Sequence, residues 1–294
     1  MIVDLFAGPG GWDEGLRMLG RTDVIGIEWD RDACATAEAA GHCRILTDVA
    51  AADPSDYAGA EGLIASPPCD SFSQNGNRGG RADARGQLMD EIGRWAAAVR
   101  PSWIACEQVP DAVDWFHVIA RDLRELGYRG YVAVRTAADY GVPQTRRRAL
   151  LMARRGEGRV SPSDITHGER PSRLEGTRAW VSMADALDIP REWVLNTGRD
   201  WKPGGDRSTA QCRPATRPAP TIGGAGSQWW WQDSAGDRIR LVEMAEMGVL
   251  QSFPLDYPWS GTRAAQFRQI GDAVPPLMAA AVLKQFITTA ERAT

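Results

Sequence analysis

Short apolar segments alternate with segments of helical periodicity over the first half of the chain. The apolar segments are followed by polar residues or glycine, which is typical of buried strands. The intervening segments repeat apolar residues every three or four positions, which predicts helices packed on a sheet. The predicted strands cover residues 2–6, 24–27, 44–46, 62–65, 103–106, 131–136 and 149–153, and the predicted helices cover residues 12–19, 32–40, 87–99 and 113–126. This alternation predicts an α/β fold with a mostly parallel sheet.

Candidate cofactor-binding groups follow the first three predicted strands. The turn from Ala7 to Gly11 follows the first, Glu28 and Trp29 follow the second, and Asp48 follows the third. Glycines let a ligand approach the backbone, an acid at this distance is typical of ribose binding, and an indole offers an apolar face to adenine. Because parallel strands share one carboxyl edge, we expect a single nucleotide-type site. The structural alternative is that Glu28 caps the next helix and Trp29 packs in the core.

A candidate nucleophile follows the fourth predicted strand. Residues 62–65 lead into Pro67 and Pro68, which prevent a helix from starting, and Cys69 comes next. The strand at 103–106 ends at Glu107, so a thiol and a carboxyl group are expected at the same edge. Arg146 and Arg148 alternate along an extended segment and are expected to share one side. The plainer interpretation is a packed cysteine and two surface ion-pair partners.

Composition narrows the class of protein. The chain has 294 residues, five cysteines without Cys-x-x-Cys spacing and three histidines, so no metal site is expected. No apolar run is long enough to span a bilayer and the N-terminus opens directly into an apolar strand, which predicts a cytoplasmic protein. The net charge is −4, but residues 141–238 hold more Arg and Lys than Asp and Glu. This asymmetry indicates a basic face for a polyanion, or equally an ordinary solvated surface.

With these motifs in order, the chain resembles the DNA cytosine-5 methyltransferases. Each motif is modest alone, and their shared order carries the resemblance, which covers nearly all of the chain except about residues 155–215. The matching segments are 4–11, Glu28-Trp29, Asp48, Pro67-Pro68-Cys69 with Phe72-Ser73, Glu107-Gln108-Val109, 144–148, 217–222 and 271–276.

The resemblance implies a cofactor, S-adenosylmethionine, which becomes S-adenosylhomocysteine. It places Phe6 and the glycine turn at the methionine end, Glu28 on the ribose, and Trp29 and Asp48 around the adenine. The cofactor-binding residues it implies are Phe6, Ala7, Gly8, Gly10, Gly11, Glu28, Trp29, Asp48, Val49, Pro68, Asp272, Ala273 and Val274.

The resemblance also implies a covalent mechanism. Cytosine C5 is a poor nucleophile until a group adds at C6, so Cys69 attacks C6 while Glu107 hydrogen-bonds or protonates N3. Arg148 helps to hold the base or its adduct, and Arg146 lies nearby. Because C6 is inaccessible in a stacked duplex, the base must be flipped out of the helix.

The implied fold is a Rossmann-like methyltransferase domain, with helices on both faces of the sheet, plus a small irregular target-recognition lobe. We assign residues 1–154 to the first part of the catalytic domain, 155–240 to the lobe and 241–294 to the return, with helices at 241–251 and 276–283. Residues Trp229 to Trp231 are expected to pack under the lobe, the alternative being wedges in the base stack. The implied partner is double-stranded DNA, with either a cognate restriction endonuclease or a phage modification pathway, and the chain is expected to be a monomer.

Two positions depart from the family pattern. Gln108 stands where the family usually has Asn, and Asp272 stands where it has Asn after Gly. Because of these departures, a catalytically weak DNA-binding protein is an alternative interpretation. Methylation of tRNA uses the same chemistry, although the Cys-Phe-Thr signature usual in that branch is absent, and a nicotinamide-dependent oxidoreductase is a further alternative. Adduct formation with 5-fluorocytosine DNA distinguishes an enzyme from a binder.

Overall fold

The computed structural model describes residues 1–68, 86–161, 163–174, 176–198, 212–223 and 228–287. The chain divides into two compact units. The first contains residues 1–135, 147–164 and 279–294, and the second contains residues 136–146 and 165–278. This division follows packing, whereas the boundaries at 154 and 240 concern function and stay a prediction. Cys69 lies outside the described residues.

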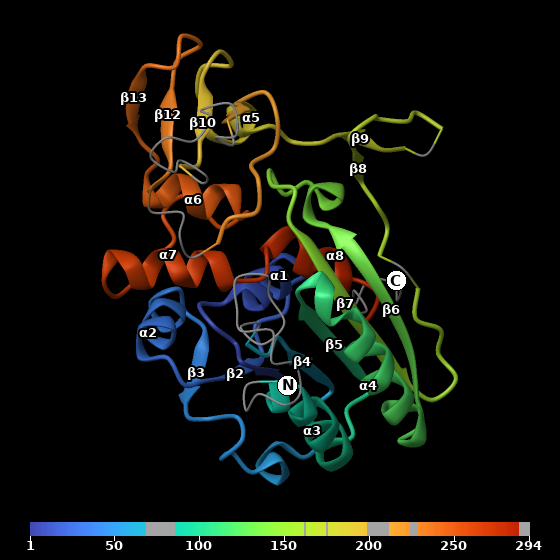
Figure 1. The fold of residues 1–294 in the computed structure, drawn as a ribbon. Helices are drawn as coiled ribbons and strands as arrows, with labels where there is room; N and C mark the ends of the chain where they lie inside the picture. The colour runs from blue at the N-terminus through green and yellow to red at the C-terminus, as the bar shows by residue number, and fades with distance from the viewer. Residues whose placement is uncertain (69–85, 162, 175, 199–211, 224–227, 288–294) are drawn as a thin grey trace, which may run out of the picture. The chain divides into compact units, whose positions relative to one another are not determined.

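The first unit is built on a seven-stranded sheet in the order β3-β2-β1-β4-β5-β7-β6 (Figure 1). Strands β3, β2, β1, β4 and β5 are parallel to their neighbours, and β7 runs antiparallel to β5. The mostly parallel α/β sheet predicted from the sequence is therefore confirmed. The strands are β1 (Ile2–Leu5), β2 (Val24–Glu28), β3 (Cys43–Leu46), β4 (Gly62–Ala65), β5 (Trp103–Gln108), β6 (Tyr128–Thr136) and β7 (Arg147–Arg155).

Helices cover both faces of this sheet. Val3 and Leu5 of β1 pack into a core with residues of α3 and α4, which Figure 1 shows side by side. Asp4 points to the opposite face because side chains alternate along a strand. On that face, α1 pairs with β3 through Asp13 and Arg44. The helices are α1 (Gly11–Met18), α2 (Arg31–Ala39), α3 (Glu91–Val99) and α4 (Val113–Glu125), with 3-10 turns at Pro54–Tyr57, Gly86–Asp90 and Pro110–Ala112. A further 3-10 turn, Ala137–Tyr140, belongs to the second unit.

The helix starts follow from local sequence. The Asp30 carboxylate accepts hydrogen bonds from the Asp32 and Ala33 amides and so caps α2. Gly10, with φ 110°, precedes α1, whose first turn holds Asp13 and Glu14. The helix predicted over 87–99 begins as a 3-10 turn, and its α-helical part starts at Glu91.

The second unit contains a four-stranded sheet and a helical layer. Its elements are β8 (His167–Gly168), β9 (Arg178–Ala179), α5 (Met183–Leu187), β10 (Val194–Asn196), β11 (Cys212–Pro214), β12 (Trp230–Gln232), β13 (Arg238–Leu241), α6 (Met244–Leu250) and α7 (Arg263–Asp272). Helix α8 (Pro276–Leu283) has the predicted bounds and passes from the second unit into the first. The helix predicted from 241 is corrected, because Leu241 pairs with Trp230 in the sheet.

The predicted packing of the tryptophan run is confirmed at two of its positions. Trp229 and Trp231 are buried in the core of the second unit with Leu195, Met247 and Phe267. Trp230 is half-buried, and the Arg238 guanidinium lies 5.5 Å from its ring centroid. Two of these indoles therefore serve the core, as large apolar side chains usually do.

Candidate active site

The order of the strands defines where a ligand is expected in the first unit. From β1 the chain moves outward through β2 to β3, and then returns to place β4 on the other side of β1. In open parallel sheets, ligands bind at the carboxyl ends of the strands where the order reverses. The reversal here lies between β1 and β4, which are paired from Ile2 and Gly62 to Leu5 and Ala65. The expected site is thus formed by the residues that follow these two strands and their neighbours.

The turn after β1 has an unusual backbone. Phe6 has φ 58° and Gly8 has φ 56°, both in the left-handed region. This region is an outlier for a bulky residue such as Phe6 and costs free energy that the surrounding structure must supply. No described atom lies within 4 Å of the position that a Cβ on Gly8 would occupy. The turn therefore combines local strain with open space above its second left-handed residue, as a ligand-approach site requires.

Glu28 fixes this turn from the neighbouring strand. Its buried carboxylate accepts hydrogen bonds from the amides of Gly8, Trp29 and Asp30, each at 2.8 Å. Trp29 is 72% exposed, which excludes the interpretation that it packs in the core. Asp48, after β3, is exposed and accepts a hydrogen bond from the Ala50 amide at 2.9 Å, while Val49 is buried. An exposed indole and two acids therefore follow adjacent strands at one edge of the sheet.

Arg44 supports the same turn from beneath. Its fully buried guanidinium forms a two-point ion pair with Asp13, at 2.8 and 3.2 Å, and its Nε donates to the Gly8 carbonyl at 3.2 Å. Gly26 makes this possible, because a Cβ there would overlap the guanidinium and lie 2.8 Å from Ala7 Cβ. Gly8 is therefore held at both its N–H, by Glu28, and its C=O, by Arg44. Sequence reasoning did not identify Arg44.

The chain that leads to Cys69 is anchored at the end of β4. Gln108 Nε2 donates to the Pro67 carbonyl at 2.9 Å, and its Oε1 accepts from the Val109 amide at 2.7 Å. Trp12 Nε1 donates to Ser66 Oγ at 2.9 Å. The buried Gln108 amide thus ties the end of β5 to the proline pair that precedes the cysteine. The role of Gln108 was not predicted, although its departure from the family pattern drew attention to it.

Glu107 lies beside an arginine. Arg148 Nε is 2.6 Å from Glu107 Oε1, and the two side chains are 11% and 7% exposed. Glu107 Oε1 is not aligned as the acceptor of a hydrogen bond from any described residue. Glu107 Oε1 is therefore buried and held mainly by the charge of Arg148. The expected position of Glu107 at the same edge as the cysteine strand follows from the parallel pairing of β4 and β5, from Gly62 with Trp103 to Ala65 with Cys106.

Cys106, one residue before Glu107, has a different environment. It is fully buried in the core, and burial raises the pKa of its thiol, with the Asp4 charge adding to the effect. A thiol with a raised pKa is a poor nucleophile, because the thiolate is the reactive form. This environment leaves Cys106 inert, although it lies in β5, adjacent to β4 and the strand end that leads to Cys69.

The remaining predicted site residues belong to the second unit. Arg146 is 2% exposed and its Nη1 donates to the Ile222 carbonyl at 3.1 Å. Asp272 is exposed at the last position of α7, and Ala273 and Val274 are buried directly after it. Arg146 and Arg148 thus lie in different units, each with its own partner.

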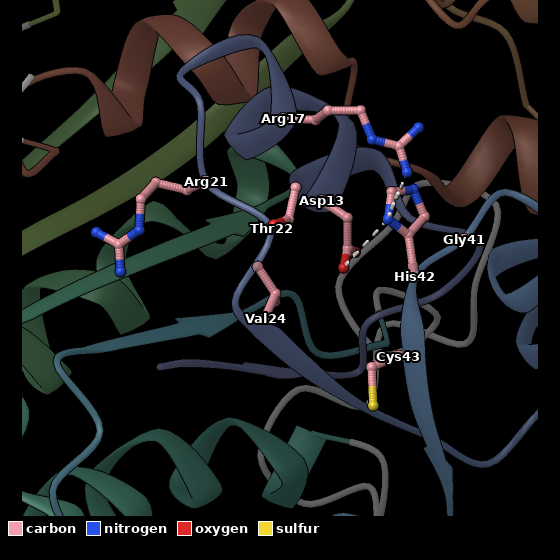
Figure 2. Close-up of a pocket in the computed structure, with 8 residues that line it drawn as sticks. All are labelled: Asp13, Arg17, Arg21, Thr22, Val24, Gly41, His42 and Cys43. Carbon is pink, nitrogen blue, oxygen red and sulfur yellow. Dashed lines mark hydrogen bonds and ion pairs between the residues drawn. The ribbon is translucent and has the colours of Figure 1, made fainter.

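A small polar pocket in the first unit lies away from these strand ends. It is lined by Asp13, Arg17, Arg21, Thr22, Val24, Gly41, His42 and Cys43. Figure 2 shows His42 between Arg17 and Asp13, at 3.3 and 3.9 Å. Val24 and Cys43 begin β2 and β3, so this pocket is at the amino ends of the strands. Its charged groups already have ion-pair partners, Asp13 with Arg44, Arg17 with Glu14, and Arg21 with Asp23 and Glu61, which gives the pocket a structural role.

The described residues contain no group of three or more His, Cys, Asp or Glu side chains placed to hold a metal ion. Among the described helices, none combines the length and the apolar character that crossing a bilayer requires.

Comparison with known families identifies the class of protein to which this chain belongs. The model of the family described as C-5 cytosine-specific DNA methylase matches residues 1–196 and 199–288. The chain belongs to this family. It is a DNA cytosine-5 methyltransferase with a Rossmann-like fold, and membership of a methyltransferase family implies S-adenosylmethionine as the general methyl donor.

Individual relatives support the same assignment over the whole length. The Type II methyltransferase M1.HphI of Haemophilus parahaemolyticus is 25% identical over 319 residues, covering 95% of this chain and 84% of the relative. The Type II methyltransferase M.AplI of Arthrospira platensis is 28% identical over 321 residues, covering 99% and 86%. The structure of the S. pombe Dnmt2 methyltransferase has a TM-score of 0.72 at 16% identity, covering 98% of this chain and 99% of that chain, and shows likeness of fold.

Proposed function

We propose that this methyltransferase modifies C5 of a cytosine flipped out of a short double-stranded DNA sequence, through a covalent bond between Cys69 and C6. The observation that carries this proposal is the anchoring of Pro67, two residues before Cys69, by Gln108, one residue after Glu107. Through this contact, the segment bearing the nucleophile and the segment bearing the acid are held at the carboxyl ends of two paired strands. A reaction that needs both groups on one pyrimidine ring requires such a constraint.

In the proposed mechanism, Cys69 must first lose its proton, because the thiolate is the nucleophile. The sulfur bonds to C6, and the electron density that develops on the ring is stabilised at N3 by a hydrogen bond or proton from Glu107. Arg148 holds the Glu107 carboxylate by charge at 2.6 Å. Once C5 carries the methyl group, water accepts the C5 proton, the electrons of that C–H bond restore the C5–C6 double bond, and the bond between C6 and sulfur breaks. The thiolate is regenerated, and any proton given to N3 returns to Glu107.

The first unit fits the proposed cofactor, S-adenosylmethionine. The open space over Gly8, the exposed Trp29 and the carboxylates of Glu28 and Asp48 provide room, a stacking surface and hydrogen-bond acceptors. When bound, the cofactor supplies an electrophilic methyl group on a sulfonium sulfur. The residues proposed to hold it also include Phe6, Ala7, Gly10, Gly11, Val49, Pro68, Asp272, Ala273 and Val274.

DNA contacts are assigned to the second unit and to the lobe at residues 155–240. Flipping a base costs a few kcal/mol of stacking and pairing, which contacts to the DNA must offset. Exposed arginines of this unit, such as Arg217 and Arg238, provide charge for phosphate binding. Because the relatives are named Type II methyltransferases, we further propose that the chain protects DNA from a companion endonuclease, with a phage modification pathway as the alternative setting.

A trapping experiment tests the reaction. DNA with 5-fluorocytosine retains fluorine at C5, so the proton-loss step is blocked and the covalent adduct accumulates. We expect an adduct with the wild type in the presence of S-adenosylmethionine, none with Cys69→Ser, and normal adduct with Cys43→Ser, which changes an exposed thiol at the far end of β3. The DNA substrate is a genomic library in which all cytosines are replaced, so that the unknown target is present.

Two results would contradict the proposal. Failure of the wild type to form an adduct, or persistence of the adduct in Cys69→Ser, removes the covalent mechanism. Bisulfite sequencing of DNA from cells that express the chain then reports the modified base and its sequence context. Modification confined to tRNA in the same cells would remove the assignment of DNA as substrate.

A further inference from the structure

A buried pair of glutamine amides lies at the centre of the second unit. Gln144 and Gln251 are both fully buried, and Gln144 Nε2 donates to Gln251 Oε1. Gln144 precedes Arg146 by two residues, and Gln251 follows the last residue of α6. The pair therefore joins two segments that are more than a hundred residues apart in the sequence.

Every amide proton of this pair has an acceptor. Gln144 Nε2 also donates to the Leu250 carbonyl at 3.2 Å, and Gln251 Nε2 donates to the carbonyls of Ile270 and Ala273, each at 2.9 Å. Gln144 Oε1 accepts from the Ile222 amide at 3.0 Å. An amide has two N–H groups, and in each residue both are used. A satisfied buried network of this kind fixes the segments it joins, because breaking it leaves buried polar groups unpaired.

One side of the network ends on the Ala273–Val274 segment. Gln251 caps the carbonyl groups at the C-terminus of α7, where Ile270 is in the last turn and Ala273 is the first residue beyond the helix. The next residue, Ser252, has φ 68°, and its Oγ accepts from the Leu277 amide at 3.1 Å. Gln251 and Ser252 therefore hold the chain on both sides of Val274, Pro275 and Pro276.

The other side of the network ends on the arginine segment and the loop at 217–222. Ile222 is bound through its amide by Gln144 and through its carbonyl by Arg146, at 3.1 Å. Thr145 donates its amide to the Ala219 carbonyl at 2.9 Å and accepts a hydrogen bond on Oγ1 from Arg213 at 2.9 Å. The segment that bears Arg146 is thus pinned to loop 217–222 and to β11 of the lobe.

We infer that Gln144 and Gln251 are positioning residues that couple DNA binding by the second unit to cofactor binding at Ala273 and Val274. The inference rests on the proposed function, because that proposal assigns the cofactor to the Ala273–Val274 segment and DNA to the lobe. A displacement of loop 217–222 or of Arg146 by DNA acts on Gln144, and Gln251 transmits it to the Ala273 carbonyl. Coupling of this kind is reciprocal, so each ligand tightens the binding of the other by the same factor.

The experiment measures the affinity for S-adenosylhomocysteine by calorimetry, with and without a DNA duplex that carries the target identified by bisulfite sequencing. For the wild type we expect DNA to tighten binding by a factor in the range of about 5 to 150, as is typical of coupled sites. Gln251→Met and Gln144→Met keep the side-chain size and remove the amides. Each variant is expected to bring the coupling factor down to about 1, which is no coupling, and the double variant is expected to lower it no further than the singles.

Gln266→Met is the matched control. Gln266 is on α7 and its Nε2 also donates to two backbone carbonyls, those of Trp259 and Gly261, and neither of these bonds reaches the arginine segment or Ala273. The control is expected to keep the wild-type coupling factor. If Gln251→Met fails to fold, Gln251→Asn replaces it in the test, because it keeps the amide on a shorter side chain. We expect partial coupling in this variant, and full wild-type coupling overturns the inference.

The outcomes separate the inference from the proposed function. A wild type that binds neither ligand contradicts the proposed function. A wild type that binds both ligands without coupling, or folded Gln144 and Gln251 variants with the wild-type coupling factor, overturns the inference and leaves the proposed function standing. A loss of coupling in Gln266→Met equal to that in Gln251→Met also overturns it, because the effect then belongs to α7 in general.

Discussion

Replacing Arg44 with methionine tests two roles of this residue, which stabilises the first unit and also holds the glycine turn after β1. The Arg44 side chain is fully buried and Asp13 is 2% exposed. Removing one partner of such a pair leaves the other charge buried without compensation, which typically costs about 3–5 kcal/mol. At roughly 2–4 °C per kcal/mol for a domain of this size, the melting temperature of Arg44→Met should fall by about 6–20 °C. In this variant the recorded neighbour of the Asp13 carboxylate is His42, whose Nδ1 lies at 3.9 Å.

The double variant Arg44→Met/Asp13→Leu provides the control. With both charges replaced by apolar groups, no unpaired charge is left, and stability should return to within about 1 kcal/mol of the wild type or exceed it. The affinity for S-adenosylhomocysteine should not return. In both variants the Gly8 carbonyl has lost its donor at 3.2 Å, so Gly8 keeps the bond from its amide to Glu28 but no longer the bond to its carbonyl from Arg44.

Urea denaturation followed by tryptophan fluorescence gives the free energies of unfolding, and calorimetry gives the affinities. A loss below about 1 kcal/mol in Arg44→Met would show that the ion pair is as weak as an exposed one. Recovery of cofactor-product affinity in the double variant would show that the hydrogen bond to Gly8 does not position the turn. Either result would refute the reasoning, and they refute different parts of it.

The other predictions concern single positions near the same edge. Gln108→Leu loses the bonds to Pro67 and Val109, so single-turnover methylation should slow by about 100-fold while cofactor affinity stays within a few fold. Gln108→Asn, which keeps the amide, should retain more activity. An unchanged rate in Gln108→Leu would contradict the anchoring role. Phe6→Gly relieves the left-handed strain at φ 58° but removes a half-buried ring that packs against the core, so stability should fall by less than the roughly 3–5 kcal/mol of an ordinary truncation of a packed Phe. The affinity for S-adenosylhomocysteine, measured by calorimetry, should fall as well. Burial, followed by the charge of Asp13, raises the pKa of Asp4 well above its usual value. The contribution of Asp4 to stability therefore falls as pH rises above its unfolded pKa of about 4, and Asp4→Asn should become progressively more stable relative to the wild type above that pH in urea titrations. Parallel stability curves would show that Asp4 does not titrate with a raised pKa.

The sequence predicted the sheet because its signals are local. Each strand of the first unit is a short apolar segment with a polar or glycine end, and the parallel arrangement then brings Glu28, Asp48 and Glu107 to one edge without further information. Helix α8 was predicted with its observed bounds, since Pro276 marks the first turn and the apolar run marks the rest. Where a residue lies along a strand depends on its neighbours in the sequence, so a single sequence is enough to predict it.

The supporting residues could not be predicted for the opposite reason. Arg44 in β3 reaches Asp13 in α1 only because Gly26 in the intervening strand has no side chain, a relation among three distant positions. Gln144 and Gln251 are polar residues without any local pattern, and their significance comes from carbonyl groups contributed by α6 and α7. Hydrogen-bond partners of this kind are set by tertiary packing, so neither periodicity nor composition indicates them.

Gln108 shows how a departure from a family pattern is to be judged from geometry. Its longer side chain raised the question of whether this chain had lost activity and kept only DNA binding. In the structure, both ends of the amide are used: Nε2 reaches Pro67 at 2.9 Å and Oε1 returns to the Val109 amide at 2.7 Å. The extra methylene therefore adds reach without leaving a buried amide unpaired, which would have cost stability. Because the contact supports the segment before Cys69, the longer side chain is not by itself an argument that catalysis has been lost.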